Sequence, residues 1–324
     1  MGEGVHAPVS VVVPVRCESA TLGALLDSLA AQTLVPDEII VVDGGSTDAT
    51  VQVARSHAAS QPYLRVIEAG PATPGRGRNV GINAARNEVV ALTDAGVRAE
   101  PIWLEELVRA LERQSDASVV YGNYEPVTDS YFTRCAALAY VAPRQSRPGG
   151  VLRGPSTASM LIRRAVWREV GGFPDLRAAE DLIFMERVSR AAVTIAWAPR
   201  ATVLWQLRGS FASTFRRFVT YSRHNVWSGR QRDWHYGVAR HYLVAALVVL
   251  LAALHDARWL VALPLGLLAR TLKNVWVRRA GHSVASAFHP TRLLGVLLIL
   301  LTIDAATFIG WAQAVVARQP SKAL

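Results

Sequence analysis

Residues 9–50 have the sequence VSVVVPVRCESATLGALLDSLAAQTLVPDEIIVVDGGSTDAT. Two short β-branched runs, residues 9–15 and 38–42, predict buried strands, and the leucines between them recur at the spacing of a helix over residues 21–32. Strands joined through a single helix pair in parallel within one sheet. Ligands of such sheets bind outside the carboxyl ends of the strands, so Asp43, directly after the second strand, is a candidate binding residue.

The alternation of strands and helices continues downstream. Further helices are expected over residues 48–60, 78–85, 103–114 and 180–191, and further strands over residues 64–67, 89–93, 119–123, 157–162 and 193–198. This order predicts an α/β fold with a mostly parallel sheet and helices on both faces. Asp94 follows the fourth strand and therefore lies on the same sheet edge as Asp43. Residues 124–156 are expected to form a long loop, and loops of this length are often functional.

Basic charge is concentrated in the last part of the chain. The 324 residues carry a net charge of +10, yet residues 1–207 hold 20 arginines against 22 acidic residues. Residues 208–235 hold six arginines and one aspartate, and residues 236–324 hold nine basic and two acidic residues. Because this basic part is also the most apolar and carries no nucleic-acid-binding motif, it predicts membrane lipids as partners and no nucleic acid. We expect a front domain at residues 1–207, a basic juxtamembrane segment at 208–236 and a membrane domain at 237–324.

Three apolar segments approach or exceed the roughly 20 residues that a helix needs to cross a bilayer: residues 237–254, 259–277 and 293–317. The loop at residues 270–292 carries five basic residues against one in the turn at 255–258, so the positive-inside rule places this loop in the cytoplasm. No basic signal-peptide region opens the sequence. We therefore expect a multi-pass protein of an inner or plasma membrane with a cytoplasmic front domain. The alternative is a soluble helical domain that buries these helices.

Two charged features of this part have two interpretations each. Arg216, Arg217 and Arg223 lie in the segment SFASTFRRFVTYSRHN, residues 210–225. They either contact anionic lipid headgroups, which is the simpler interpretation, or close over a bound diphosphate. Asp304, the one charge in the last apolar segment, is either a functional group or a partner in an interhelical hydrogen bond.

Candidate site residues gather in three motifs. The carboxylate of Asp43 can accept hydrogen bonds from a nucleotide base and a ribose hydroxyl, or it caps the following turn. Arg76, Arg78 and Asn79 lie where a glycine-rich loop enters a helix, an arrangement that suits a diphosphate, although Arg76 fits a solvated surface equally well. The pair Glu180-Asp181 opens a helix, whose dipole keeps a carboxylate ionised, although acids are common at this position for the sake of the dipole alone.

The order and spacing of these motifs strongly resemble the family 2 inverting glycosyltransferases of the GT-A fold, many of which carry a membrane anchor. The resemblance is carried by residues 9–50, by GRGRNVGINAARNEVVALTDAG at residues 75–96 and by RRAVWREVGGFPDLRAAEDLIFMERV at residues 163–188. It covers roughly residues 9–225. It implies a GT-A-like sheet and a nucleotide-diphosphate sugar as donor.

The resemblance also implies residue roles. It assigns Asp181 as the catalytic base, with Glu180 beside it, and Asp94 to the ribose or to a Mg²⁺ or Mn²⁺ ion on the diphosphate. The remaining donor contacts that it implies are Pro14, Asp43, Arg76, Arg78, Asn79 and, in the basic segment, Arg217. This chain departs from the family's D-x-D element at Gly96, which removes one metal ligand and predicts a weaker metal site. The family's Q-x-x-R-W motif is absent.

The predicted function is transfer of a sugar, with inversion, from a nucleotide-diphosphate sugar to a hydroxyl or phosphate acceptor at the membrane. A lipid-linked or cell-envelope glycan is the expected acceptor. The rival hypothesis is a non-catalytic membrane protein that keeps the fold as a binding or scaffold module, which the incomplete D-x-D element favours. A nucleotidyltransferase, a serine hydrolase and a P-loop kinase each lack their motifs in this sequence.

Overall fold

The computed structural model describes residues 7–317, and the chain divides into two compact units. The first unit joins Met1–Val127 to Arg144–Gln206, and the second joins Thr128–Pro143 to Leu207–Leu324. Residues 1–6 and 318–324, the outer ends of the front and membrane domains expected from the sequence, lie outside the described residues.

The first unit is built on an eight-stranded sheet with the strand order β3-β2-β1-β4-β9-β6-β10-β5. Six strands run in the same direction, whereas β9 is antiparallel to β4 and β6, and β5 is antiparallel to β10. This mostly parallel sheet confirms the predicted fold class. The strands are β1 (Val9–Val15), β2 (Glu38–Asp43), β3 (Leu64–Glu68), β4 (Val89–Leu92), β5 (Val97–Ala99), β6 (Ala117–Val127), β9 (Met160–Arg163) and β10 (Thr194–Gln206).

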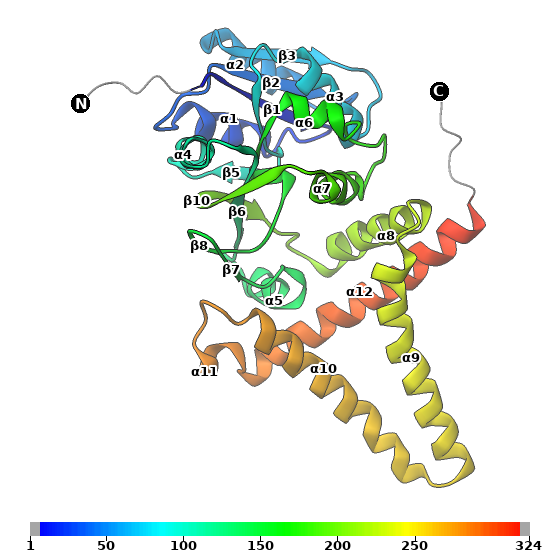
Figure 1. Cartoon of the computed structure of the whole chain (residues 1–324). Coiled ribbons are helices and arrows are strands. Elements are labelled where there is room, and N and C mark those ends of the chain that lie inside the picture. Colours follow the sequence, from blue (N-terminus) through cyan, green and yellow to red (C-terminus); the bar gives the residue numbers. More distant parts are fainter. Residues whose placement is uncertain (1–6, 318–324) are drawn as a thin grey trace. The chain divides into compact units, whose positions relative to one another are not determined.

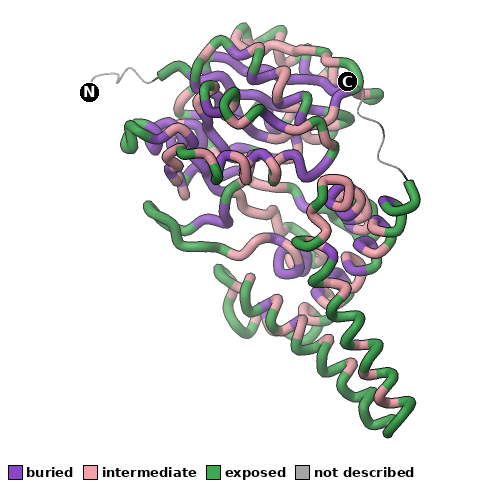
Figure 2. Tube along the Cα trace, turned by 45° about the vertical axis from the view of Figure 1, so that its right-hand side comes forward, coloured by how far each residue is buried: buried purple, intermediate pink, exposed green. Residues whose placement is uncertain are grey.

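Helices cover both faces of this sheet (Figure 1). Helices α1 (Leu22–Ala30), α2 (Thr50–Ser60) and α4 (Trp103–Arg113) pack on one face, and α3 (Pro74–Ala84), α6 (Arg164–Glu169) and α7 (Glu180–Arg190) pack on the other. Because successive strand residues point to opposite faces, Val11 and Val13 of β1 enter the first core and Val12 enters the second. The central strands β1, β2 and β4 are buried along almost their whole length, within the buried stretches coloured purple in Figure 2. Apolar residues on both faces are the pattern of a doubly covered parallel sheet.

The sheet brings the carboxyl ends of its central strands to one edge. Val15 at the end of β1 pairs with Asp43 at the end of β2, and Asp94 follows the end of β4, the other neighbour of β1. The edge expected from the sequence therefore exists, and it carries both aspartates.

The prediction of a plain loop at residues 124–156 is wrong. This stretch holds the short hairpin of β7 (Gln145–Arg147) and β8 (Gly150–Leu152), and it holds the helix α5 (Tyr131–Tyr140), which belongs to the second unit. Ser130 and Thr133 form a capping box that starts α5. The strand expected at residues 157–162 also differs, since residues Thr157–Ser159 form a single 3-10 turn before β9.

The second unit combines α5 with α8 (Phe211–Trp227), α9 (Gln231–Leu254), α10 (Ala262–Arg278), α11 (Val284–Ala287) and α12 (Pro290–Val316). Three helical segments, Gln231–Leu254, Ala257–Arg278 and Pro290–Val316, are long and apolar enough to cross a membrane. In Figure 2, α9 and α10 are exposed along most of their length. Large apolar surfaces that face no protein are expected where lipid is the solvent.

Polar side chains tie the helices of this unit together. The side chain of Asp304 on α12 is fully buried, accepts two hydrogen bonds from the Arg270 guanidinium of α10, and accepts a third from the Tyr242 hydroxyl of α9 at 3.1 Å. Asn274 donates to the carbonyl oxygens of Leu138 and Ala139, which lie at the free end of α5. Of the two interpretations of Asp304, the interhelical hydrogen bond is the one found.

Candidate active site

Asp43 organises the loop that follows β2. Its side chain is buried, and its Oδ2 accepts hydrogen bonds from the backbone N–H groups of Gly45 at 3.0 Å and Ser46 at 3.1 Å. Gly45 has a φ of +80°, and a Cβ on Gly44 would lie 2.8 Å from the carbonyl oxygen of Ala72, so both positions favour glycine. In this structure Asp43 therefore caps the turn that follows β2, which is one of its two predicted roles. A carboxylate has about four acceptor positions, so it keeps capacity for a ligand at the same edge.

Arg78 on α3 joins the second and third sequence motifs. Its guanidinium donates to Asp94 Oδ1 at 2.7 Å and to Glu180 Oε1 at 2.8 Å. The Arg78 side chain is 5% exposed, the Asp94 side chain 39% and the Glu180 side chain 7%, so Asp94 is the accessible end of the bridge. Burial by itself would lower the pKa of Arg78, but the two carboxylates outweigh it and raise that pKa, so Arg78 is a permanent cation.

Glu180 and Asp181 form the first turn of α7 and differ in environment. Burial raises the pKa of Glu180, although the Arg78 guanidinium acts in the opposite direction. The Oε2 atom of Glu180 has no hydrogen-bond partner among residues 7–317. Asp181 is half-buried, and its Oδ1 accepts from the backbone N–H of Leu182 at 2.8 Å. Ala179, just before the helix, has a φ of +69°, an uncommon conformation for a residue with a side chain. The accessible carboxylate of the pair is Asp181.

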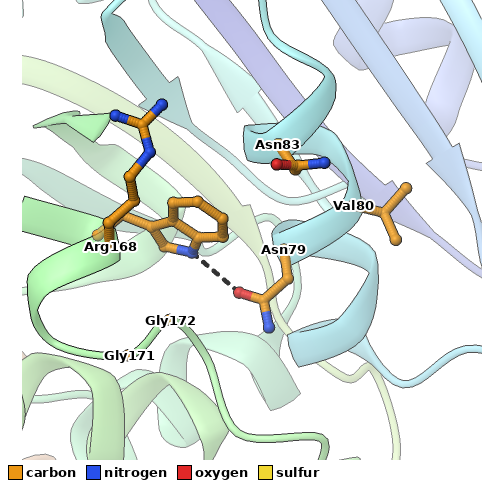
Figure 3. A pocket seen from close by; sticks show the side chains of 7 residues that line it. Asn79, Val80, Asn83, Arg168, Gly171 and Gly172 are labelled. Atoms are coloured by element: carbon orange, nitrogen blue, oxygen red, sulfur yellow. Dashed lines mark hydrogen bonds between the residues drawn. The ribbon is translucent and has the colours of Figure 1, made fainter. Parts of the chain in front are cut away.

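The other residues suggested by the sequence have different surroundings. Pro14 packs against α3, where a Cβ on Gly77 would lie 3.2 Å from the Pro14 Cβ. Arg76 is exposed to solvent. Asn79 uses its side chain within the protein, as its Oδ1 accepts from the indole N–H of Trp167 at 2.9 Å (Figure 3). Arg217 lies in the second unit, where its Nε donates to the Tyr221 hydroxyl at 2.7 Å.

A pocket of about 480 Å³ lies beside Asn79 and is drawn in Figure 3. It is lined by Asn79, Val80, Asn83, Trp167, Arg168, Gly171 and Gly172. None of the aspartates or glutamates of the three motifs lines it, so this pocket is separate from the groups at the sheet edge.

A divalent ion at this edge would depend on Asp94. Residues 7–317 contain no group of three or more His, Cys, Asp or Glu side chains that could hold a metal ion by themselves. A Cβ on Gly96 would meet no atom within 4 Å, so there is open space at Gly96, two residues after Asp94. Since Mg²⁺ is commonly held by one or two carboxylates together with substrate phosphates and water, the side chains present fit an ion that arrives with a diphosphate.

Sequence reasoning overlooked Phe173. Its ring stacks on Phe184 of α7 with a centroid distance of 3.8 Å, and the Arg78 guanidinium carbon lies 5.4 Å from its centre. Phe173 lies within the stretch at residues 163–188 that carries the resemblance, and an aromatic residue next to the glycine pair at 171–172 is the signal that could have identified it.

Comparison with known proteins identifies the domain that holds these residues. Residues 10–170 match the model described as Glycosyl transferase family 2. The chain carries a family 2 glycosyltransferase domain. This confirms the resemblance on which the residue roles were predicted.

Relatives of the family 2 domain are themselves described as glycosyltransferases. The chain is 29% identical over 163 residues to "Uncharacterized glycosyltransferase YibD" of Escherichia coli K12, covering 50% of this chain and 46% of that protein. It is 28% identical over 221 residues to "Putative glycosyltransferase EpsH" of Bacillus subtilis 168, covering 65% and 63%. The chain thus spans about half to two thirds of the length of these curated relatives.

Among solved structures, the chain is similar to the mannosyltransferase PcManGT from Pyrobaculum calidifontis, determined in complex with GDP-Man and Mn²⁺. The TM-score is 0.61 at 20% identity, and the match covers 96% of this chain and 88% of that one. At this identity the likeness establishes the GT-A fold of the family 2 domain.

Proposed function

We propose that the protein is a membrane-anchored, inverting glycosyltransferase that uses a nucleotide-diphosphate sugar. The observation that carries this proposal is the Arg78 bridge, which holds one buried cation between Asp94 and Glu180 at the sheet edge. A fixed arginine beside a strand-end carboxylate suits a leaving diphosphate, because the guanidinium offsets negative charge without any reorganisation during the reaction.

The proposed roles follow from the environment of each side chain. Asp43 holds the nucleoside, and Arg78 offsets charge on the diphosphate. The acceptor oxygen attacks the anomeric carbon as the bond from that carbon to the diphosphate oxygen breaks. The Asp181 carboxylate takes the acceptor's proton, and the nucleoside diphosphate leaves with the bonding electron pair. Asp181 suits this task because the N-terminus of α7 favours its ionised form and because it is the more accessible carboxylate of the pair.

A divalent ion is the proposed cofactor, with Asp94 as the protein ligand. Bound there with the donor, Mg²⁺ or Mn²⁺ would neutralise charge on the diphosphate. Support comes from the open space at Gly96 and from the Pyrobaculum mannosyltransferase, whose structure is a complex with GDP-Man and Mn²⁺. With a single carboxylate, we expect metal affinity to be weak in the absence of donor.

The acceptor is proposed to lie at the membrane, as a lipid-linked or cell-envelope glycan. The three apolar helical segments support an anchor by their length and composition. An anchored enzyme meets acceptors confined to the bilayer surface far more often than dissolved ones, since both partners are held in the same thin layer.

The test is a donor panel. Purified full-length protein in detergent would be incubated with UDP-, GDP- and dTDP-sugars, with and without Mg²⁺ or Mn²⁺, while binding and hydrolysis are followed. We expect one donor to be bound and turned over. Asp181→Asn should keep donor binding and lose turnover by at least about 100-fold, in the range typical for removal of a general base. The control is Glu112→Gln, an exposed acid on α4.

Two outcomes would contradict the proposal. If no donor binds under any condition, the roles given to Asp43, Asp94 and Asp181 fail. If a donor binds without turnover in both wild type and Asp181→Asn, the non-catalytic binding module is the correct function.

A further inference from the structure

The segment between α6 and α7 is fastened along α3 by the side chain of Asn79. Its Oδ1 accepts from the backbone N–H of Phe173 at 2.9 Å and from the indole N–H of Trp167 at 2.9 Å, and the second of these bonds is the dashed line in Figure 3. Its Nδ2 donates to the backbone carbonyl of Phe173 at 2.7 Å. One amide thus pairs with both polar backbone groups of a single residue, which fixes the position and the orientation of that residue.

Further contacts hold the same segment in place. Thr73, the N-cap of α3, donates a side-chain hydrogen bond to Asp175. A Cβ on Gly75 would lie 2.1 Å from the carbonyl oxygen of Pro174, so the two backbones are in direct contact. From the other side, Arg187 of α7 donates to the carbonyl oxygen of Gly172 at 3.1 Å. We call residues 171–179, held in this way on α3, the clamped segment.

The clamped segment contacts Arg78 at the sheet edge and leads into the first turn of α7. The Phe173 ring, whose backbone Asn79 holds, stacks on Phe184 of α7 and faces the Arg78 guanidinium. The segment then ends at Ala179, whose left-handed backbone leads directly into Glu180 and Asp181. A shift of Phe173 would therefore move the cation and the start of the helix that carries the proposed base.

We propose that Asn79 is a positioning residue, which holds the clamped segment on α3 so that Arg78 and the first turn of α7 keep their reactive arrangement. The proposal rests on the glycosyltransferase function proposed above and changes the role of one residue within it. The resemblance assigned Asn79 to the donor. Its contacts instead use the carbonyl oxygen twice and one amide hydrogen within the protein.

The two roles predict different kinetics. If Asn79 contacts the nucleotide sugar, removing its side chain raises the KM for that substrate. A positioning residue leaves the nucleoside contact at Asp43 intact, so KM changes little while kcat falls because the base and the cation are misplaced. Displacements of about 1 Å near reacting groups can lower rates roughly 100-fold.

The experiment uses full-length protein in detergent and the UDP-, GDP- and dTDP-sugar panel. For Asn79→Ala we expect kcat to fall by roughly 10- to 100-fold with KM within about threefold of wild type. Trp167→Phe, which keeps the ring packing but removes one of the three hydrogen bonds, should give a smaller fall of the same kind. Asn83→Ala is the matched control, one turn further along α3 and exposed.

Hydrogen exchange gives a readout that does not need activity. Amides of residues 171–181 should exchange at least about tenfold faster in Asn79→Ala than in wild type, and at an unchanged rate in Asn83→Ala. If Asn79→Ala does not fold, Trp167→Phe provides both measurements.

Three results would overturn the proposal: a KM increase at unchanged kcat, wild-type kinetics in Asn79→Ala, or exchange in residues 171–181 that does not respond to the substitution. Failure of the glycosyltransferase proposal looks different, because wild-type protein would then turn over no donor. In that case exchange decides whether Asn79 holds the segment, and an unchanged exchange rate would reject the clamp as well.

Discussion

At the scale of single residues, Arg78 is the cation that pairs with two carboxylates of the candidate site. It is almost fully buried, and so is Glu180, whereas Asp94 reaches solvent. Removing one partner of a buried ion pair leaves the other charge without compensation, which costs far more than the pair contributes when intact. Both stability and activity therefore depend on this guanidinium, and the loss of stability on its removal should depend on pH.

We expect Arg78→Gln to destabilise the protein by about 3–5 kcal/mol at neutral pH. Without the guanidinium, burial raises the pKa of Glu180 further above the ordinary 4.5. A carboxyl whose pKa is raised by folding is best tolerated when protonated, so the loss should shrink toward pH 4 and grow as pH rises. Thermal unfolding between pH 4 and pH 8 measures this. Arg76→Gln, at the exposed position two residues earlier, should leave the stability unchanged. The double variant that combines Arg78→Gln and Glu180→Gln should recover part of the lost stability.

A second residue-scale prediction concerns the chain's two cysteines. Cys17 is exposed, and hydrogen bonds from the backbone and side chain of Thr47 lower the pKa of its thiol below 9.0. Cys135 is buried, and burial raises its thiol pKa. Because the thiolate is the reactive form, iodoacetamide should label Cys17 at least about tenfold faster than Cys135 at pH 8. Peptide mass spectrometry measures both rates, and equal labelling would contradict the predicted surroundings.

At the scale of elements, α12 owes its close contacts to two glycines. A Cβ on Gly295 would lie 2.7 Å from the Cys135 Sγ of α5, and a Cβ on Gly310 would lie 2.5 Å from the Val219 carbonyl oxygen of α8. Helices approach this closely only where one of them lacks a side chain, which is the common basis of tight helix packing in membranes. The second unit is therefore organised along α12, with α5 and α8 contacting it at separate points.

Gly310→Ala should destabilise the second unit, because the new methyl group meets a backbone oxygen that cannot move without a shift of α8. Overpacking of this kind costs about 1–3 kcal/mol. The matched control is Gly266→Ala on α10, where a Cβ would meet no atom within 4 Å and alanine is the better helix former. Thermal unfolding in detergent should show a lower Tm for Gly310→Ala alone. Equal Tm values would show that α8 and α12 do not pack as described.

How far the elements could be predicted depends on how local their signals are. β1, β2 and α1 were foreseen almost to the residue, since β-branched runs and leucine spacing are carried by the segments themselves. α5 was missed because its mixed sequence YFTRCAALAY is buried by helices that come much later in the chain, namely α8, α10 and α12. The sheet edge with Asp43 and Asp94 followed from strand order alone. The Arg78 bridge and the contacts of Asn79 could not, because no sequence spacing encodes pairings across about 100 residues.

At the scale of the whole molecule, charge and apolarity divide the chain in the same way. The part before residue 208 is nearly neutral, whereas the part from residue 208 onward combines all of the excess basic charge with three apolar helical segments. Arginines at the ends of such helices are retained on the cytoplasmic side during insertion. The distribution of charge between the loops therefore predicts one topology for the three segments.

We expect reporter fusions to place residue 281 in the cytoplasm and both residue 256 and the C-terminus on the opposite side. The turn near Asp256 follows α9 and holds one basic residue, whereas the stretch from Arg270 to Arg292 holds five. A fusion after Gln206 serves as the cytoplasmic control. A paired alkaline phosphatase and fluorescent protein reporter at each site distinguishes the sides, because each is active on one side only. Cytoplasmic signals at all three test sites would indicate helices that do not cross the bilayer, and an outward signal at residue 281 would reverse the topology and contradict a cytoplasmic donor site.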